Sequence, residues 1–158
     1  MKAVEKLESL LEDQSVCYEL FKHPIAYTSQ MTAQAEHVPG SEEAKVVILN
    51  ADGKNVMVVL PSTHHVDLSE MADLLGALNV RLETESNLDR LFPDCETGAM
   101  PPFGNIYQMP VYVDRALTEN ENIVFNAGSH FQAMRMKYED YSKLVRPKVR
   151  DIALRIDQ

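Results

Sequence analysis

Residues 44–60, AKVVILNADGKNVMVVL, contain the pattern that decides the fold. Two runs of β-branched and other apolar residues, 44–50 and 56–60, flank the turn-forming pair Asp52-Gly53. This arrangement is typical of a β-hairpin. Both runs are continuously apolar rather than alternating, which indicates that other parts of the protein cover both faces of the hairpin. The sequence therefore predicts a sheet with helices packed on it.

The segments around the hairpin complete a mixed pattern of helices and strands. We expect an amphipathic helix through Leu11, a strand over 16–22, a short helix from Thr28 or Ser29 to about Glu36, a helix over 68–75 between Asp67 and Gly76, a strand over 80–83, helical turns over 87–92, strands over 110–114, 123–126 and 131–137, and a helix over 138–146. The sequence has neither a βαβαβ alternation nor a Gly-rich nucleotide fingerprint. The prediction is one α/β (α+β) domain over residues 1–158, with a mixed, mostly antiparallel sheet and helices around it.

The composition is typical of a globular protein, with 45% hydrophobic and 25% charged residues among 158. No apolar run approaches the roughly 20 residues of a membrane span, and residues 1–13 lack the features of a signal peptide. We therefore expect a cytoplasmic protein with no membrane contact. Cytosolic thiols stay reduced, so Cys17 and Cys95 are expected to be unlinked.

The net charge of −9 argues against a general nucleic-acid binder, but the charge is uneven. Residues 135–158 hold seven basic residues against four acidic ones, whereas the other 134 residues hold eight against twenty. Two interpretations of this C-terminal segment stay open. It is a solvated final helix, or it is a local contact for the phosphates of an RNA end.

Three places could carry chemistry. Lys45 begins a strand that is otherwise apolar. It is either an edge lysine with its amine in water or a partly buried cation that binds a phosphate or acts as a base. The loop GAMPPFG, from Gly98 to Gly104, is stiffened by prolines and can present backbone groups to a reacting carbonyl or amine. Its alternative role is that of a structural turn.

The third place is the stretch from Asn126 to His130, NAGSH, after an apolar strand. Adjacent residues of a strand point apart, so Ser129 and His130 are not expected to form a nucleophile–base pair, and a structural histidine is the alternative. His64 and His65, near Asp67, also fail to form a metal-binding motif because adjacent histidines rarely share one ion. We expect no metal and no cofactor.

Taken in order, these pieces resemble the YbaK/prolyl-tRNA-synthetase-associated domain family of aminoacyl-tRNA deacylases. The resemblance extends from about Tyr18 to Arg146. The residues that carry it are His23-Pro24, Ala44-Lys45, the helix after Asp67, the loop Gly98-Ala99-Met100-Pro101-Pro102 and the turn Phe125-Asn126-Ala127-Gly128. The resemblance implies a YbaK-like fold and the removal of wrong amino acids from tRNA after the synthetase has released it.

The resemblance also implies roles for individual residues. Lys45 is expected to hold the phosphate of the terminal adenosine, and Gly98 and Pro102 match the GxxxP loop that positions the aminoacyl group and water. The expected substrate-binding residues are Val46, Ala99, Met100, Pro101, Gly128, Ser129 and His130. Subgroups that remove alanine often have asparagine where this chain has Val46, which predicts a differently shaped pocket here.

The expected substrate is an aminoacyl-tRNA, one for proline or a related one, carrying a small amino acid. Prolyl-tRNA synthetase or another synthetase is the expected protein partner, and the oligomeric state stays open. Two rival functions are a non-catalytic module that binds a tRNA acceptor end or a synthetase, and a ligand-binding domain unrelated to translation. The acidic body fits delivery by a synthetase, whereas the set of ordered motifs favours the deacylase.

Overall fold

The hairpin of residues 44–60 forms the centre of the molecule. A computed structural model describes residues 2–22 and 40–156. In it, β2 (Ala44–Ala51) and β3 (Lys54–Pro61) pair antiparallel from Ala44 opposite Pro61 to Ala51 opposite Lys54. Asp52 and Gly53 form the turn, with φ of 51° and 91°. The predicted hairpin is confirmed, and its tight turn follows from the Asp-Gly pair.

Further strands extend this hairpin and build a second sheet beside it. The five-stranded sheet has the order β5-β2-β3-β6-β9, where β5 is Val80–Leu82, β6 is Val111–Asp114 and β9 is Lys148–Arg150. The three-stranded sheet has the order β1-β8-β7, where β1 is Tyr18–Lys22, β8 is Gln132–Lys137 and β7 is Asn122–Ser129. A two-stranded ribbon joins β4 (His64–Val66) to β10 (Ala153–Arg155).

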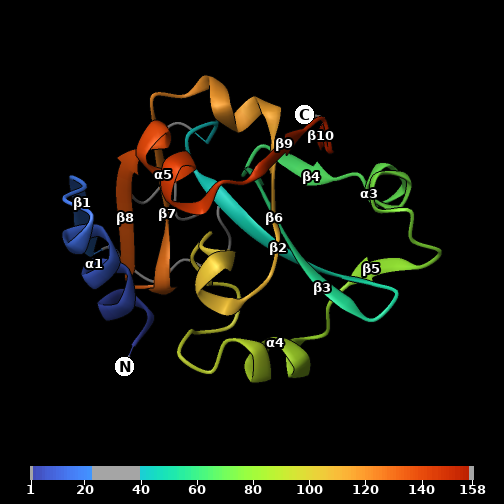
Figure 1. Cartoon of the computed structure of the whole chain (residues 1–158), viewed down its shortest axis with the longest axis horizontal. Helices are drawn as coiled ribbons and strands as arrows, with labels where there is room; N and C mark the ends of the chain where they lie inside the picture. Colours follow the sequence, from blue (N-terminus) through green and yellow to red (C-terminus); the bar gives the residue numbers. More distant parts are fainter. Residues whose placement is uncertain (1, 23–39, 157–158) are drawn as a thin grey trace.

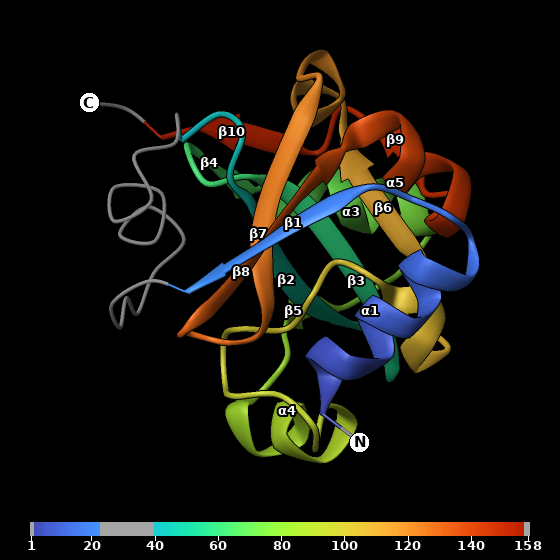
Figure 2. The same ribbon diagram turned by 90° about the vertical axis from the view of Figure 1, so that its left-hand side faces the viewer.

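Helices lie on both sides of the central hairpin. These are α1 (Ala3–Asp13), α3 (Leu68–Leu75), α4 (Glu85–Leu91) and α5 (Tyr138–Val145), with short 3₁₀ turns at Gly104–Tyr107 and Arg115–Glu119. In Figure 1, α1 and the β7–β8 pair lie on one side of the hairpin and α3 lies on the other. Figure 2 shows β1 and β8 crossing in front of the central sheet.

The two faces of β3 contact two different cores. Met57 and Val59 belong to the larger core, which includes α1, the β7–β8 pair and α5. Val56, Val58 and Leu60 belong to a second core with Met71 of α3. Burial of both faces explains why the hairpin sequence is apolar without alternation.

Local signals in the sequence predicted both ends of α3, whereas α4 begins at Glu85 and not at the expected residue 87. The Asp67 carboxylate accepts a hydrogen bond from the Glu70 N–H and so caps α3, and Gly76 ends it at φ 63°. The mostly antiparallel pairing is also confirmed. However, β6 pairs parallel to both β3 and β9, and the sequence did not predict β4, β9 or β10. The expected helix over residues 28–36 lies outside the described residues.

Two further expectations concern the whole chain. Cys17 and Cys95 are free thiols, as predicted. Within residues 2–22 and 40–156, none of the helices has the length and apolar character needed to cross a membrane.

Candidate active site

The Gly98–Pro102 loop is held against the end of β7 by backbone hydrogen bonds. The Glu96 N–H donates to the Gly128 carbonyl at 2.8 Å, and the Gly128 N–H donates to the Ala99 carbonyl at 2.9 Å. The loop is therefore joined to a strand that lies about 30 residues further along the chain, and the distances are those of good hydrogen bonds.

A buried tyrosine fixes the other end of the loop. The Tyr141 hydroxyl donates to the Pro102 carbonyl at 2.7 Å, and the Tyr141 side chain is fully buried. Burial raises the pKa of Tyr141 well above its usual value, so the hydroxyl keeps its proton and remains a donor. Ala99, Met100, Pro101 and Pro102 are buried, whereas Gly98 is exposed and has φ of 83°. A rigid loop thus presents one accessible glycine.

His130 lies directly against this glycine. A Cβ placed on Gly98 would be 3.8 Å from Cε1 of the His130 ring. Nε2 of His130 is 2.9 Å from the carbonyl oxygen of Thr97, and the His130 N–H donates to Oε1 of Glu96 at 2.6 Å. Since a carbonyl only accepts, Nε2 carries a proton in this contact. The structure therefore brings together two of the predicted motifs.

Ser129 has a different role from its neighbour. Its hydroxyl oxygen accepts a hydrogen bond from the Phe131 N–H at 2.9 Å within the turn between β7 and β8. The strand register shifts between Asn126 and Ser129, which turns the chain at this point. Ser129 stabilises the turn that places His130.

Lys45 lines a separate cavity of about 280 Å³. The other lining residues are Val47, His65, Val66, Leu68 and Leu82. The side chain is half-buried, and this loss of solvation lowers the pKa of Lys45. Lys45 is thus a cation beside apolar walls and not a freely solvated edge lysine.

Val46 points to the opposite face of β2 from Lys45. It packs against the larger core, which also contains Met100, whereas Val47 packs against the second core. Successive strand residues alternate between faces, so Lys45 shares the second face with Val47. The candidate site therefore has two parts: the loop with its turn, and the Lys45 cavity.

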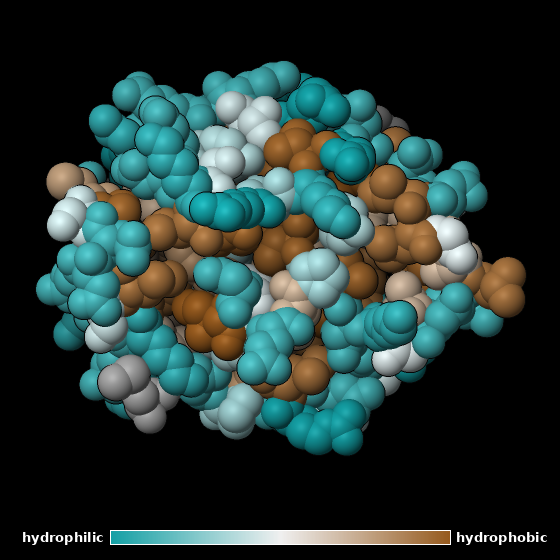
Figure 3. Space-filling view, in the orientation of Figure 1, coloured by the Kyte–Doolittle hydropathy of each residue, from teal (hydrophilic) through white to brown (hydrophobic). Residues whose placement is uncertain are grey.

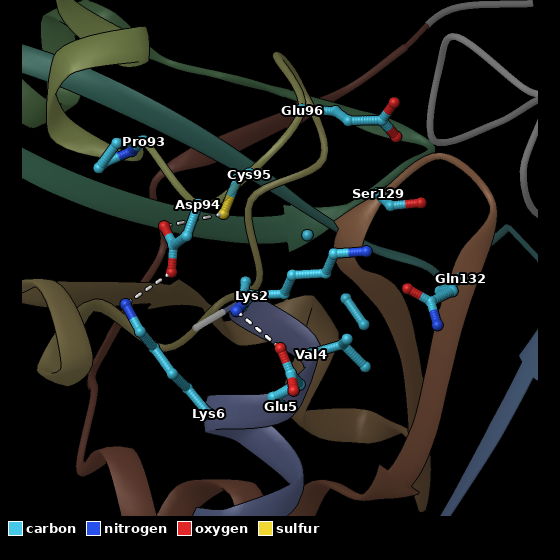
Figure 4. A pocket seen from close by; sticks show the side chains of 13 residues that line it. Lys2, Val4, Glu5, Lys6, Pro93, Asp94, Cys95, Glu96, Ser129 and Gln132 are labelled. Carbon is cyan, nitrogen blue, oxygen red and sulfur yellow. Dashed lines mark hydrogen bonds and ion pairs between the residues drawn. The ribbon is translucent and has the colours of Figure 1, made fainter.

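A larger cavity of about 890 Å³ is lined in part by the segment that precedes the loop. It lies between the start of α1, the Pro93–Glu96 segment and the ends of β7 and β8, and Gly128 and Ser129 form part of its wall. Figure 4 shows Lys6 of α1 directed at Asp94, and the two side chains form an ion pair of 2.8 Å. The Tyr107 hydroxyl also donates to Asp94 at 3.1 Å. The ion pair attaches α1 to the segment that precedes the loop, and the Tyr107 bond attaches the following 3₁₀ turn to the same segment.

Cys95 lies in this wall but is not suited to nucleophilic chemistry. Burial raises the pKa of its thiol to about 12, so it stays protonated at neutral pH. Sequence reasoning missed the roles of Asp94, Glu96 and Thr97, although all three immediately precede the GxxxP loop. Their partners lie far away in the sequence, so the sequence pattern gave no sign of these contacts.

Two of the described histidines, His64 and His130, make hydrogen-bond contacts within the protein. Nδ1 of His64 lies 2.9 Å from the Thr63 hydroxyl. In the described part of the chain, no three His, Cys, Asp or Glu side chains are grouped so that they could hold a metal ion. His23 and His37 lie outside the described residues.

Comparison with known proteins finds relatives that cover most of the chain. The multifunctional Ser/Thr-tRNA deacylase ProXp-y of Escherichia coli, in strains K12 and O157:H7, is 24% identical over 150 residues, which cover 92% of this chain and 89% of the relative. The fold matches the hypothetical protein APE2540 with a TM-score of 0.85 and 20% identity, over 94% of this chain and 99% of that one. It matches a candidate trans-editing enzyme for prolyl tRNA synthetase with a TM-score of 0.84 and 18% identity, over 98% of each chain.

The family assignment rests on a match over most of the chain. Residues 23–144 match the sequence model of the aminoacyl-tRNA editing domain. This match and the similarity to ProXp-y confirm the resemblance, the expected fold and the enzyme class of aminoacyl-tRNA deacylase. The chain belongs to the aminoacyl-tRNA editing domain family.

Proposed function

We propose that this protein acts in trans on mischarged tRNA and hydrolyses the ester that joins a small amino acid to the terminal adenosine. Its family membership makes aminoacyl-tRNA the substrate class. The observation that carries the proposal is the Gly98–Pro102 loop, which is held rigidly against Gly128 and Tyr141 and exposes Gly98 beside the His130 ring. The proposal assigns the aminoacyl ester to this loop.

The backbone of the loop limits which groups can contact the reacting carbonyl. The Ala99 N–H already donates to the Glu96 carbonyl, and Pro101 and Pro102 have no N–H. Within the loop, the N–H groups of Gly98 and Met100 remain, and we assign them to the developing oxyanion. A donor held in place before the reaction stabilises such charge most effectively. Because an aminoacyl ester is already activated, positioning water beside it can suffice without a strong nucleophile.

Lys45 is assigned to the phosphate of the terminal adenosine. A lysine ammonium acts as a point charge toward phosphate, and apolar walls strengthen its field by excluding water. The two parts of the site would then bind two ends of one nucleotide, with the ester at the loop and the phosphate at Lys45. In this arrangement Lys45 orients the substrate and does not act as the base.

The amino acid is the least constrained part of the proposal. We take serine and threonine as the first candidates because the E. coli relative is a Ser/Thr-tRNA deacylase. Val46 lies on the face of β2 that packs toward Met100, so it can shape an apolar wall for a small side chain. A methyl group in such a pocket changes binding by only about 1–3 kcal/mol, so overlapping substrates are expected. A cytoplasmic location and a prolyl-tRNA synthetase partner belong to the same proposal.

The test is deacylation of a panel of tRNAs charged with alanine, serine, threonine or proline. We expect wild type to clear at least one mischarged tRNA, and Lys45→Ala to clear it far more slowly. Lys54→Ala is the matched control because Lys54 is an exposed lysine at the other end of the same hairpin. If wild type binds these tRNAs and clears none, the protein is a binding module and the proposal is wrong. Equal rates for Lys45→Ala and wild type would contradict the role of Lys45.

A further inference from the structure

The strand β10 lies beside β4, which contributes His65 and Val66 to the wall of the Lys45 cavity. β10 pairs with β4, so that Arg155 lies opposite His64 and Leu154 lies opposite His65. The Ile156 N–H also donates to the Thr63 carbonyl at 2.9 Å and extends this ribbon. The pairing brings Arg155, from the basic segment 135–158, next to β4. Side chains of directly opposite residues in such a pair are about 5 Å apart at Cβ.

Several basic groups gather at this end of the sheet. His65 lines the cavity that contains Lys45. Burial is the main cause that lowers the pKa of His64, and the positive charges of Arg155 and Lys45 lower it further. Both charges must therefore be within electrostatic reach of His64. Arg155 itself is exposed.

A carboxylate within electrostatic reach of His64, that of Asp114, is held by the protein's own backbone. The negative charge of Asp114 acts to raise the pKa of His64, and Asp114 is almost fully buried. One of its oxygens accepts from the Ile152 N–H and the other from the Ala116 N–H. These contacts hold the Asp114 carboxylate inside the protein and leave the exposed Arg155 as the charge that a ligand meets.

The Lys45 cavity has the size and lining of a site for a flat, partly apolar group. Its volume of about 280 Å³ is below the usual range for sites that hold a drug-sized ligand. Val66 and Leu68 provide apolar walls beside the His65 ring, and apolar surface continues over α3 and β5 at the right-hand side of Figure 3. Unpaired RNA bases stack on imidazole and aromatic rings, while lysine and arginine contact the phosphates between them.

We propose that the β4–β10 ribbon binds the unpaired nucleotides of the tRNA 3′ end that precede the terminal adenosine. His65 stacks on a base that enters the cavity, and Arg155 contacts a phosphate upstream of the one that Lys45 holds. This inference rests on the proposed function. It also explains how a protein with a net charge of −9 can bind RNA: the attraction is confined to a few cations beside the site.

The test compares two substrates that share the ester and the terminal phosphate. One is a mischarged tRNA, and the other is the same amino acid esterified to the 3′ hydroxyl of adenosine 5′-monophosphate, which lacks all upstream nucleotides. We expect His65→Ala and Arg155→Gln to raise KM for the tRNA by roughly 5-fold to 100-fold, as for the loss of a stacked base or a phosphate contact. Arg155→Gln should hydrolyse the small ester like wild type, because Arg155 is not among the residues that line the Lys45 cavity, whereas His65→Ala should lose less on the small ester than on the tRNA. Arg146→Gln is the matched control, because Arg146 is an exposed arginine of the same basic segment outside the ribbon.

Other results would overturn the inference. Unchanged KM for tRNA in both variants excludes the ribbon as a contact. An equal loss on both substrates indicates that the residues only support the fold, and an equal effect of Arg146→Gln indicates general electrostatics. Arg155→Gln should also remove one phosphate contact. The slope of log KM against log salt concentration should therefore become shallower by about one. If wild type hydrolyses neither substrate, the proposed function itself is wrong and this inference falls with it.

Discussion

Nε2 of His130 lies 2.9 Å from the carbonyl oxygen of Thr97, the residue immediately before Gly98. This contact joins the turn after β7 to the start of the GxxxP loop. Two backbone bonds through Gly128 reinforce it. The loop therefore cannot move without the β7–β8 turn, and we expect substitutions in either segment to affect the same step of catalysis.

Replacing Gly128 by alanine should destabilise the protein by more than backbone strain alone. Its φ is 96°, and an added Cβ would lie 2.6 Å from Cβ of Ala3 in α1. Gly53→Ala is the matched control, because Gly53 has φ of 91° and an added Cβ would meet nothing within 4 Å. We expect Gly53→Ala to cost about 1–2 kcal/mol of unfolding free energy and Gly128→Ala about 2 kcal/mol beyond that, measured by denaturant titration. Equal costs would contradict the close contact of α1 with this turn.

Gly98→Ala tests the loop itself. An added Cβ would make ordinary contact with the His130 ring, so the variant should fold at a cost of roughly 1–2 kcal/mol from its φ of 83°. Because the methyl group would stand where the ester is assigned, we expect the single-turnover rate of deacylation to fall by about 10-fold to 100-fold. Gly76→Ala is the matched control. Gly76 ends α3 with φ of 63°, and an added Cβ would meet nothing within 4 Å, so this variant has the same kind of backbone strain outside the loop. If Gly98→Ala keeps full activity, as the control Gly76→Ala should, the ester does not bind at Gly98.

Glu83 should make the protein sensitive to acid. Its carboxylate is buried and accepts hydrogen bonds from the side-chain amides of Asn87, Asn55 and Asn50 and from the Thr84 N–H. These bonds, led by the one from Asn87, hold the pKa of Glu83 far below its usual range. A carboxylate with a lowered pKa stabilises the fold above the pKa of the unfolded chain, and this stability is lost as the pH falls toward the folded value.

The measurement is the free energy of unfolding of wild type and Glu83→Gln between pH 7 and pH 3. We expect wild type to be more stable by about 2–4 kcal/mol at pH 7, since the variant leaves buried amides without a charged acceptor. The difference should shrink steadily as the pH falls below about 5. A difference that stays constant over this range would contradict the lowered pKa.

The two cysteines should differ in reactivity. Cys17 is exposed, whereas burial raises the pKa of Cys95 to about 12. At pH 7.5, alkylation followed by mass spectrometry should modify Cys17 long before Cys95 in the folded protein, because the thiolate is the reactive form. Unfolding in denaturant should make the two rates similar. Rapid modification of Cys95 in the folded state would contradict its place in the wall between Asp94 and Tyr107.

The sequence predicts those parts of the fold that depend on neighbouring residues. The Asp52-Gly53 turn, the Asp67 cap and the Gly76 stop each act within a few residues and are found where expected. The strands β4, β9 and β10 have three residues each and exist because of distant partners. Segments of three residues are too short to show the alternation of apolar and polar residues by which a strand is predicted.

The candidate site divides in the same way. The order of motifs implied that the Gly98 loop and the Gly128 turn act together, and the structure brings them into contact. The sequence predicts that Lys45 and Val46 point to opposite faces of β2, but it could not show which core each face meets, because both faces are apolar. It also could not show that Arg155 lies opposite His64 on β4, since this depends on pairing between strands about 90 residues apart.

Lys45 should also impose a pH limit on substrate binding. Desolvation lowers its pKa, so its positive charge is lost at a lower pH than that of an ordinary lysine. We therefore expect KM for mischarged tRNA to rise as the pH increases through this lowered value, because the ammonium that attracts the phosphate disappears. Lys45→Arg, which stays protonated, should flatten this alkaline rise even if its activity is lower. An identical profile for the two proteins would exclude titration of Lys45 as the cause.

The most direct measurement of the central claim is the single-turnover deacylation rate of Lys45→Ala on a mischarged tRNA that wild type clears. We predict that the rate falls by at least about 100-fold at low tRNA concentration, with Lys54→Ala unchanged and the fold intact by thermal unfolding. Such a result would identify Lys45 as the residue that orients the ester toward the Gly98 loop. A Lys45→Ala protein that clears the tRNA at the wild-type rate would contradict the account.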